Sequence, residues 1–151
     1  MTMHAIMRMG PVIPEVVVEH VSQAMPLADA LADGGINVIE ITLRSAAALD
    51  CIAAIANQHP QMTVGAGTVL TPAQMQAAKD AGAAFAVSPG AYPDLIKASA
   101  ASDLPLLPGA ATASEMMALM AAGLTAMKFF PAAVAGGIDY LRAVASPLAD
   151  A

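Results

Sequence analysis

Short apolar runs alternate with alanine-rich segments along the whole chain, and this alternation constrains the fold more than any other feature of the sequence. The apolar runs end near Gly or Pro, as buried strands do, and the segments between them are long enough for helices. Repeated strand–helix units indicate an α/β protein with a parallel sheet. We predict six strands, at residues 12–18, 38–43, 63–67, 84–88, 104–107 and 126–130.

A helix is predicted after each strand, and several boundaries have a physical cause. Pro72 follows Thr71 as a first-turn proline follows an N-cap, and Thr112 with Glu115 makes a capping-box pattern. Pro26 is tolerated only if it lies in the first turn of its helix. The regular succession resembles a (β/α)8 barrel of the TIM type, in which chemistry occurs at the C-terminal ends of the strands. The predicted helices cover residues 22–33, 46–58, 72–81, 93–100, 114–122 and 138–144.

Composition is that of a soluble enzyme domain and argues against several other classes. The chain of 151 residues suits a single domain with a substantial core, because 58% of the residues are hydrophobic. A net charge of −6 with scattered basic residues argues against nucleic-acid binding. No apolar run reaches the roughly 18 residues of a membrane helix, and residues 1–10 lack the features of a signal peptide. We therefore expect a cytoplasmic protein with no membrane partner.

Cysteine and histidine give no sign of a metal site. Cys51 lies in a predicted helix among Ala and Ile, so we expect it to be buried rather than catalytic. His4, His20 and His59 have no Cys or acidic partners at metal-ligand spacing, and surface positions are expected for them.

Lys128 interrupts an apolar run, Thr125-Ala-Met-Lys-Phe-Phe-Pro131, that is typical of a strand buried on both faces. Burial removes water from an ammonium group and favours the neutral amine, which is a nucleophile. Since Lys79 and Lys97 lie in predicted helices, Lys128 is the candidate for a Schiff base with a carbonyl substrate. From this segment alone, a lysine that reaches from a strand end to water is an equally good interpretation.

The strand at 38–43 carries the strongest sign of a functional site. Successive side chains of a strand point to opposite faces, so Glu40, Thr42 and Arg44 share one face and three apolar residues share the other. In a barrel the apolar face packs on helices, which leaves a carboxylate and a guanidinium inside the barrel. The alternative is a solvated antiparallel strand, but the helices predicted on either side argue against it.

Small and polar residues follow the next strands. Gly65-Ala-Gly-Thr68 ends the third strand, where a backbone can approach a ligand and a hydroxyl can bind one. The signal is weak by itself, because glycines at strand ends more often serve turns. Ser88-Pro-Gly90 and Pro108-Gly109 give sharp exits after the fourth and fifth strands.

Five segments in this order resemble the 2-keto-3-deoxy-6-phosphogluconate (KDPG) and 4-hydroxy-2-oxoglutarate aldolase family. The similarity runs from about Gly10 to the end, and the segments that carry it are Glu40-Ile-Thr-Leu-Arg44, Gly65-Ala-Gly-Thr68, Ser88-Pro-Gly90, Pro108-Gly109 and Lys128-Phe-Phe-Pro-Ala132. The resemblance implies a class I aldolase, a lyase that needs no cofactor or metal and acts on a 2-keto acid. It also implies a homo-oligomer, a trimer in this family.

The resemblance implies a role for each matched residue. Lys128 attacks the keto carbon to give a carbinolamine and then an imine, and Glu40 is the general acid/base. Arg44 and Thr68 bind the pyruvate carboxylate. Among the apolar groups, Pro89 lines the pocket and Phe130 packs near the imine. The expected products from KDPG are pyruvate and glyceraldehyde 3-phosphate.

Two departures from the family stand out. Ala151 follows the sixth helix, whereas the family's barrel has two further strand–helix units, so we expect an incomplete barrel of one domain (1–151) with unpaired edge strands. The phosphate site of such barrels lies after the seventh and eighth strands, so no residue here is assigned to it. Glu15 stands in the first strand where the family has an apolar residue, and parity alone does not decide which way it faces.

Two alternatives belong to other functional classes. A catalytically silent barrel fragment would act only as an assembly or interaction partner through its exposed strand edges. A phosphate-sugar isomerase on a similar barrel is weakened because such chemistry does not need Lys128 within this strand.

Overall fold

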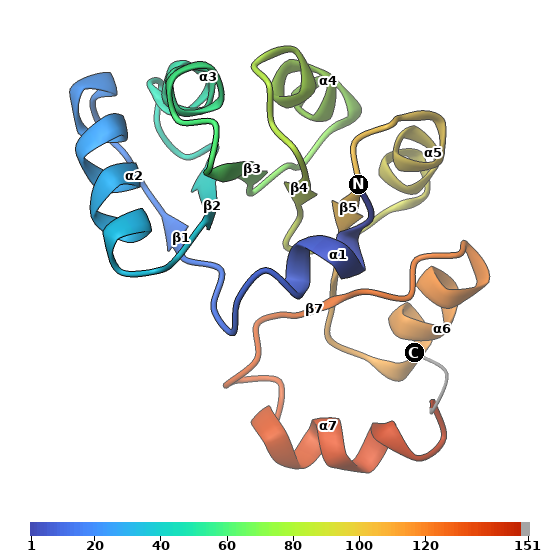
Figure 1. The fold of residues 1–151 in the computed structure, drawn as a ribbon. Coiled ribbons are helices and arrows are strands. Elements are labelled where there is room, and N and C mark those ends of the chain that lie inside the picture. Colours follow the sequence, from blue (N-terminus) through green and yellow to red (C-terminus); the bar gives the residue numbers. More distant parts are fainter. Residues whose placement is uncertain (149–151) are drawn as a thin grey trace.

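The computed structural model describes residues 1–148, whose strands form one parallel sheet of five strands and a parallel pair (Figure 1). The order in the larger sheet is β1-β2-β3-β4-β5, so each strand pairs with its neighbour in sequence. Parallel pairing with a helix between strands confirms the predicted α/β class. The strands are β1 (Glu15–Val16), β2 (Val38–Thr42), β3 (Thr63–Gly67), β4 (Ala86–Val87), β5 (Leu106–Leu107), β6 (Gly109–Ala110) and β7 (Lys128–Phe129).

Helices follow the strands as predicted, with boundaries displaced by a few residues. Pro26 lies in the first turn of its helix. The Thr71 side chain caps its helix, and Thr112 and Glu115 form the expected capping box. No helix within residues 1–148 is long and apolar enough to cross a membrane. The helices are α1 (Met3–Met7), the 3-10 helix η1 (Val21–Gln23), α2 (Ala24–Asp33), α3 (Ala48–Gln58), α4 (Pro72–Asp80), α5 (Pro93–Ala101), α6 (Ala113–Ala121) and α7 (Gly137–Ala145).

Strands β5 and β6 are two parts of one extended segment, interrupted at Pro108. Proline has no N–H to donate to a sheet, so it breaks the ladder. The Pro108 carbonyl still accepts a hydrogen bond of 2.8 Å from the Lys128 N–H, and the Ala110 carbonyl accepts one of 3.1 Å from the Phe130 N–H. The segment therefore joins the two sheets, and β7 follows β5 and β6 as the sixth strand of the array.

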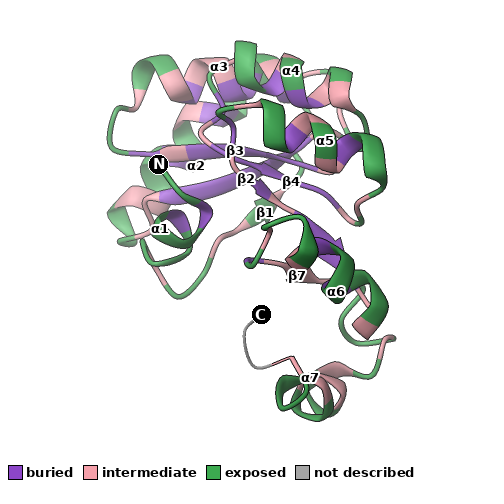
Figure 2. Ribbon diagram, turned by 90° about the vertical axis from the view of Figure 1, so that its right-hand side faces the viewer, coloured by how far each residue is buried: buried purple, intermediate pink, exposed green. Residues whose placement is uncertain are grey.

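The two faces of β2 pack in two different environments, as its sequence pattern predicts. Ile39 and Ile41 belong to the large core between the strands and helices α2, α3, α4 and α5. Val38 lies on the opposite face, in a smaller core with Phe85 and Val87. Figure 2 shows the strands as the buried layer beneath exposed helix faces. The even-numbered side chains of β2 therefore point to the interior of the array.

Helix α1 was not predicted from the sequence. Its five residues are too few to show a helical repeat, although Thr2 caps it. Met3 and Ile6 are buried against Val38 and Ala126, which begin or precede β2 and β7. The helix therefore closes the amino-terminal end of the array and leaves the carboxyl ends of the strands open (Figure 1).

The predicted strands at 12–18, 84–88, 104–107 and 126–130 were too long. β1 keeps only Glu15 and Val16 because Pro14 cannot donate to the ladder and the strand pairs with β2 alone within the described residues. The prediction that Lys128 lies in a strand buried on both faces was also wrong. Both residues of β7 are half-buried, and 24% of the Lys128 side chain is exposed.

Candidate active site

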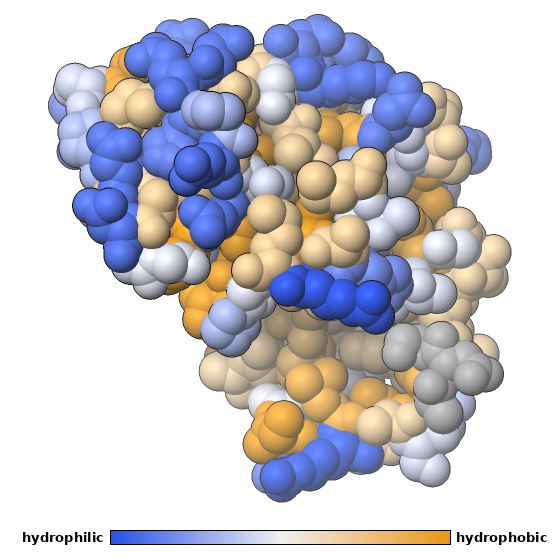
Figure 3. All heavy atoms as spheres, in the orientation of Figure 1, coloured by the Kyte–Doolittle hydropathy of each residue, from blue (hydrophilic) through white to orange (hydrophobic). Residues whose placement is uncertain are grey.

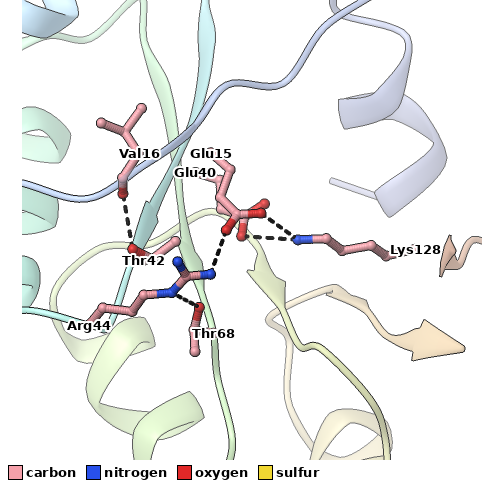
Figure 4. Close-up of polar contacts among 7 residues, drawn as sticks. All are labelled: Glu15, Val16, Glu40, Thr42, Arg44, Thr68 and Lys128. Atoms are coloured by element: carbon pink, nitrogen blue, oxygen red, sulfur yellow. Dashed lines mark hydrogen bonds and ion pairs between the residues drawn. The ribbon is translucent and has the colours of Figure 1, made fainter. Parts of the chain in front are cut away.

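Charged side chains from β1, β2 and β7 meet in the interior of the strand array (Figure 4). Lys128 Nζ donates a hydrogen bond of 2.7 Å to Glu15 Oε2, and it lies 3.7 Å from Glu40 Oε1. Glu15 and Glu40 are register partners in the parallel pair β1–β2, which aligns the two carboxylates beside each other. The lysine is thus held between two acids that come from strands on the opposite side of the array.

Lys128 is held at its backbone as well as at its side chain. Its N–H bonds to Pro108 and its register partner is Gly109. The ammonium lies 5.4 Å from the centroid of the Phe130 ring, close enough for a cation–π contact. Phe130 itself is exposed, so the ring forms one wall of an open site.

Glu40 is almost fully buried, with 5% of its surface exposed. Its Oε1 has no hydrogen-bond partner among the described residues, and the neighbouring Lys128 ammonium is its nearest countercharge. Burial raises the pKa of the Glu40 carboxyl, although Lys128 acts in the opposite direction. A carboxyl in this state can hold and release a proton nearer to neutral pH than an exposed glutamate.

The glycines of β3 make room for this carboxyl. A Cβ on Gly67 would overlap the Glu40 carboxylate, and one on Gly65 would overlap the Phe85 ring. The glycine signal in the sequence therefore has a packing cause, and Gly67 serves the site indirectly through Glu40.

Arg44 and Thr68 follow β2 and β3 and lie side by side at the carboxyl ends. Arg44 Nε donates to Thr68 Oγ1 at 3.3 Å, and Arg44 Nη2 donates to Glu15 Oε1 at 2.8 Å. Thr68 has φ of 56°, in the left-handed region. That conformation costs a β-branched residue free energy and is found preferentially at functional sites.

Thr42 and Pro89 pack beside the charged cluster and make no ion pair with it. The Thr42 hydroxyl is fully buried and donates to the Val16 carbonyl at 3.1 Å, so it ties β2 to β1. The Pro89 carbonyl lies against Gly109, where a Cβ would collide with it. Pro89 is thus packed on the register partner of Lys128.

Glu15 is the residue of the site that sequence reasoning left unassigned. It bridges both cations, and the hydrogen bond from Lys128 is the main cause that lowers the pKa of its carboxyl. The signal was present in the sequence as a carboxylate within an apolar run. That the Glu15 side chain points into the site follows only from its register with Glu40.

The remaining candidates lie outside this cluster. Cys51 is a free thiol in the large core, as expected, and burial raises its pKa. His4 bonds to Thr125 at 2.9 Å, and His59 lies 3.5 Å from Asp29. Within residues 1–148, no group of three or more His, Cys, Asp and Glu side chains is arranged to hold a metal ion.

The fold and site together define a parallel α/β barrel type of protein with a lysine beside a buried carboxyl, which is an arrangement suited to carbonyl chemistry. The family model for KDPG and KHG aldolase, where KHG stands for 2-keto-4-hydroxyglutarate (4-hydroxy-2-oxoglutarate), matches residues 3–151. The KHG/KDPG aldolase of Escherichia coli K12 is 48% identical over 143 residues, which are 95% of this chain and 67% of that protein.

Solved structures agree. The KDPG aldolase of Legionella pneumophila, with pyruvate captured as a covalent carbinolamine, superposes with a TM-score of 0.94 at 43% identity and covers 97% of this chain and 71% of its own. The enzyme of Zymomonas mobilis ATCC 29191 gives a TM-score of 0.96 at 41% identity and covers 99% of this chain and 72% of its own.

The chain therefore belongs to the KDPG and KHG aldolase family. It is a lyase of the class I, Schiff-base-forming aldolases on a TIM-barrel type of fold, as the resemblance implied. The chain spans about two thirds of the length of these relatives. The catalytically silent alternative is not favoured, since the matching relatives bear aldolase names.

Proposed function

We propose that this chain cleaves 2-dehydro-3-deoxy-6-phosphogluconate to pyruvate and glyceraldehyde 3-phosphate through a Schiff base on Lys128. Cleavage of 4-hydroxy-2-oxoglutarate to pyruvate and glyoxylate is the second expected activity. The observation that carries the proposal is the distance of 3.7 Å between Lys128 Nζ and the buried carboxyl of Glu40. A nucleophile and a proton carrier thus lie within reach of one carbonyl carbon.

In the first step the Lys128 amine, after losing a proton, adds to the keto carbon. The carbonyl oxygen takes up one proton as the nitrogen loses one, which gives the carbinolamine, and a second proton on its hydroxyl lets it leave as water, which gives the protonated imine. Glu40 supplies and accepts these protons, a role supported by its raised pKa and its position next to Nζ. The carbinolamine captured with pyruvate in the Legionella pneumophila relative supports this step.

In the second step the carbon–carbon bond breaks. Glu40 removes the proton of the hydroxyl group on the leaving carbon, which departs as an aldehyde. The electron pair of the broken bond moves to the protonated imine and forms an enamine. Protonation of the enamine carbon and hydrolysis of the imine release pyruvate and restore Lys128.

Four residues would orient the keto acid. The planar guanidinium of Arg44 suits a carboxylate better than an ammonium does, and Thr68 bonds to Arg44 from the next strand end. Phe130 and Pro89 would form the apolar wall, with the Phe130 ring 5.4 Å from Nζ. By family, we also propose a cytoplasmic homo-oligomer, a trimer, acting on small keto acids.

Borohydride reduction in the presence of pyruvate tests the proposal. The protein should gain the mass of one reduced pyruvate adduct, and peptide mapping should locate it on Lys128. Lys79 and Lys97 are internal controls, because they lie on helices and pair with Asp103 and Asp94. An adduct distributed over Lys79 and Lys97 instead would refute the Schiff-base assignment.

A further inference from the structure

We propose that Glu15 is a specificity-determining residue whose carboxylate occupies the place of the substrate carboxylate on Arg44, so that a 2-keto acid must displace it. The inference rests on the proposed function, because it assumes that Arg44 binds the keto acid and that Lys128 attacks it. It concerns a residue for which the family comparison implies no role.

The geometry of Glu15 resembles that of the expected ligand. One carboxylate oxygen lies 2.8 Å from Arg44 Nη2 and the other 2.7 Å from Lys128 Nζ. In a 2-keto acid the carboxylate is bonded directly to the carbonyl carbon. If Arg44 holds that carboxylate, the neighbouring carbon comes toward Lys128, so the keto acid spans the same two cations that Glu15 now spans.

The charges make the two occupants exclusive. Glu15 is an anion over the neutral range, because the hydrogen bond from Lys128 lowers the pKa of its carboxyl. Glu40 adds a second acidic group next to Lys128. A keto acid that entered without displacing Glu15 would place another carboxylate beside these acids, and juxtaposed like charges oppose binding.

Glu15 can leave Arg44 without disturbing the core. A third of its side chain is exposed, and it begins a strand of two residues that pairs only with β2 within the described residues. Arg44 is half-exposed at the open carboxyl ends of the strands. The side chain can therefore swing toward water, at the cost of its two ion pairs.

A carbonyl compound that lacks a carboxylate has no need of Arg44. Its reaction with Lys128 therefore leaves the contact between Glu15 and Arg44 in place. Glu15 should weaken the binding of 2-keto acids but not that of small neutral ketones, and so shift the preference of the site toward uncharged carbonyl substrates.

Trapping with cyanoborohydride at Lys128 compares pyruvate with hydroxyacetone, a neutral ketone of similar size. The ketone concentration that gives half-maximal labelling of Lys128 is measured for both compounds in the unaltered protein and in Glu15→Gln and Glu15→Val. Glu19→Gln is the matched control, since its carboxylate makes none of the ion pairs described for residues 1–148. Because both ketones react with the same amine, their ratio cancels any change in Lys128 reactivity.

We expect the pyruvate concentration that gives half-maximal labelling to fall about ten-fold in both Glu15 variants. The corresponding concentration of hydroxyacetone should change less than about two-fold. Glu19→Gln should leave the ratio unchanged. Glu15→Gln preserves the shape of the side chain, so it gives the answer even if Glu15→Val does not fold.

Three other outcomes overturn the inference. If Lys128 is labelled by both ketones and the ratio is the same in all variants, Glu15 only braces β1 against β7, and the proposed function stands. A parallel loss of labelling by both ketones in the Glu15 variants would lead to the same conclusion. If no variant and not even the unaltered protein is labelled on Lys128, the proposed function fails and the inference fails with it.

Discussion

The two halves of the candidate active site are held in different ways. Glu40 lies on β2, all five residues of which are buried, and Gly67 on β3 leaves space for its carboxyl. Lys128 lies on β7, whose two residues are only half-buried, and the following helix α7 has no buried residue. Figure 3 shows apolar atoms at the surface of the lower part of the molecule, where α7 lies, and Val134 and Ile138 are 86% and 61% exposed.

The contrast shows which forces position each group. Packing fixes the carboxyl of Glu40, because its strand is covered on both faces. Polar contacts fix the amine of Lys128, through Pro108 at the backbone and Glu15 at the side chain. Stacking of Phe129 on Tyr140, with centroids 5.6 Å apart, adds an apolar contact between β7 and α7. Substitutions in the two regions should therefore fail in different ways.

The largest effect is expected from Lys128→Ala. Loss of the amine removes the covalent path, so pyruvate release should fall about a thousand-fold or more. Some unfolding free energy should also be lost, because Glu15 and the buried Glu40 lose their shared countercharge. Release is measured with a coupled pyruvate assay and stability by urea unfolding. Lys97→Ala, on an exposed face of α5, is the control. Retained turnover in Lys128→Ala would assign the nucleophile elsewhere.

Glu40→Gln should lower turnover about a hundred-fold, as is usual for a removed general acid/base. Pyruvate should still form an adduct at high concentration, because Arg44 and Lys128 remain. The comparison of kcat with the half-saturation of trapping separates proton transfer from binding. Unchanged kcat would transfer the proton-carrying role to water or to Glu15.

The region around β7, which is only half-buried, can be tested by adding a neighbouring strand instead of by removing a contact. β7 pairs only with β6 within the described residues, so a chimera in which the two further strand–helix units expected of this family follow the chain should give it a second neighbour. We expect kcat/KM for the phosphorylated substrate to rise about ten- to a hundred-fold, the equivalent of one or two charge-assisted hydrogen bonds to phosphate. Equal activity and equal size-exclusion profiles of the two proteins would contradict this.

Much of this architecture is encoded locally. The parity of β2 predicted that Glu40 and Arg44 face the interior, and the apolar run around Lys128 predicted its strand. Helix α1 was not predicted because five residues are too few to show a helical repeat. The length of β1 and the partner of Glu15 were not predicted because they depend on pairing between residues far apart in sequence. Glu15 and Lys128 are separated by 113 residues, and only the curvature of the strand array brings them together.

Gly67→Ala tests the packed half directly. The added Cβ would collide with the Glu40 carboxylate, which is almost fully buried. We expect a loss of about 1–3 kcal/mol in unfolding free energy, typical of overpacking, together with lower turnover as Glu40 is displaced. Gly10→Ala is the matched control, since its Cβ would meet only the Val12 carbonyl at an ordinary distance of 3.8 Å. Equal stability of the two variants would show that β3 adapts.

The smallest effects should distinguish the two carboxylates by the sign of their pH dependence. The folded-state pKa of Glu15 is lowered by its bond from Lys128, so the protein gains stability as pH rises through that value to the unfolded one. The folded-state pKa of Glu40 is raised by burial. The protein therefore loses stability as pH rises from the pKa of Glu40 in the unfolded protein to its pKa in the folded protein. Relative to the unaltered protein, Glu15→Gln should become less stable as pH increases and Glu40→Gln more stable.

Urea unfolding at intervals from about pH 3 to about pH 8 measures both differences. For Glu15 the difference should stay below about 1 kcal/mol, because a third of the side chain is exposed and solvent screens its ion pairs. If both differences change in the same direction, the two carboxylates share one environment and the contrast between a packed and a polar half of the site is wrong. Opposite slopes would assign packing to β2 and ion pairing to the link between β1 and β7.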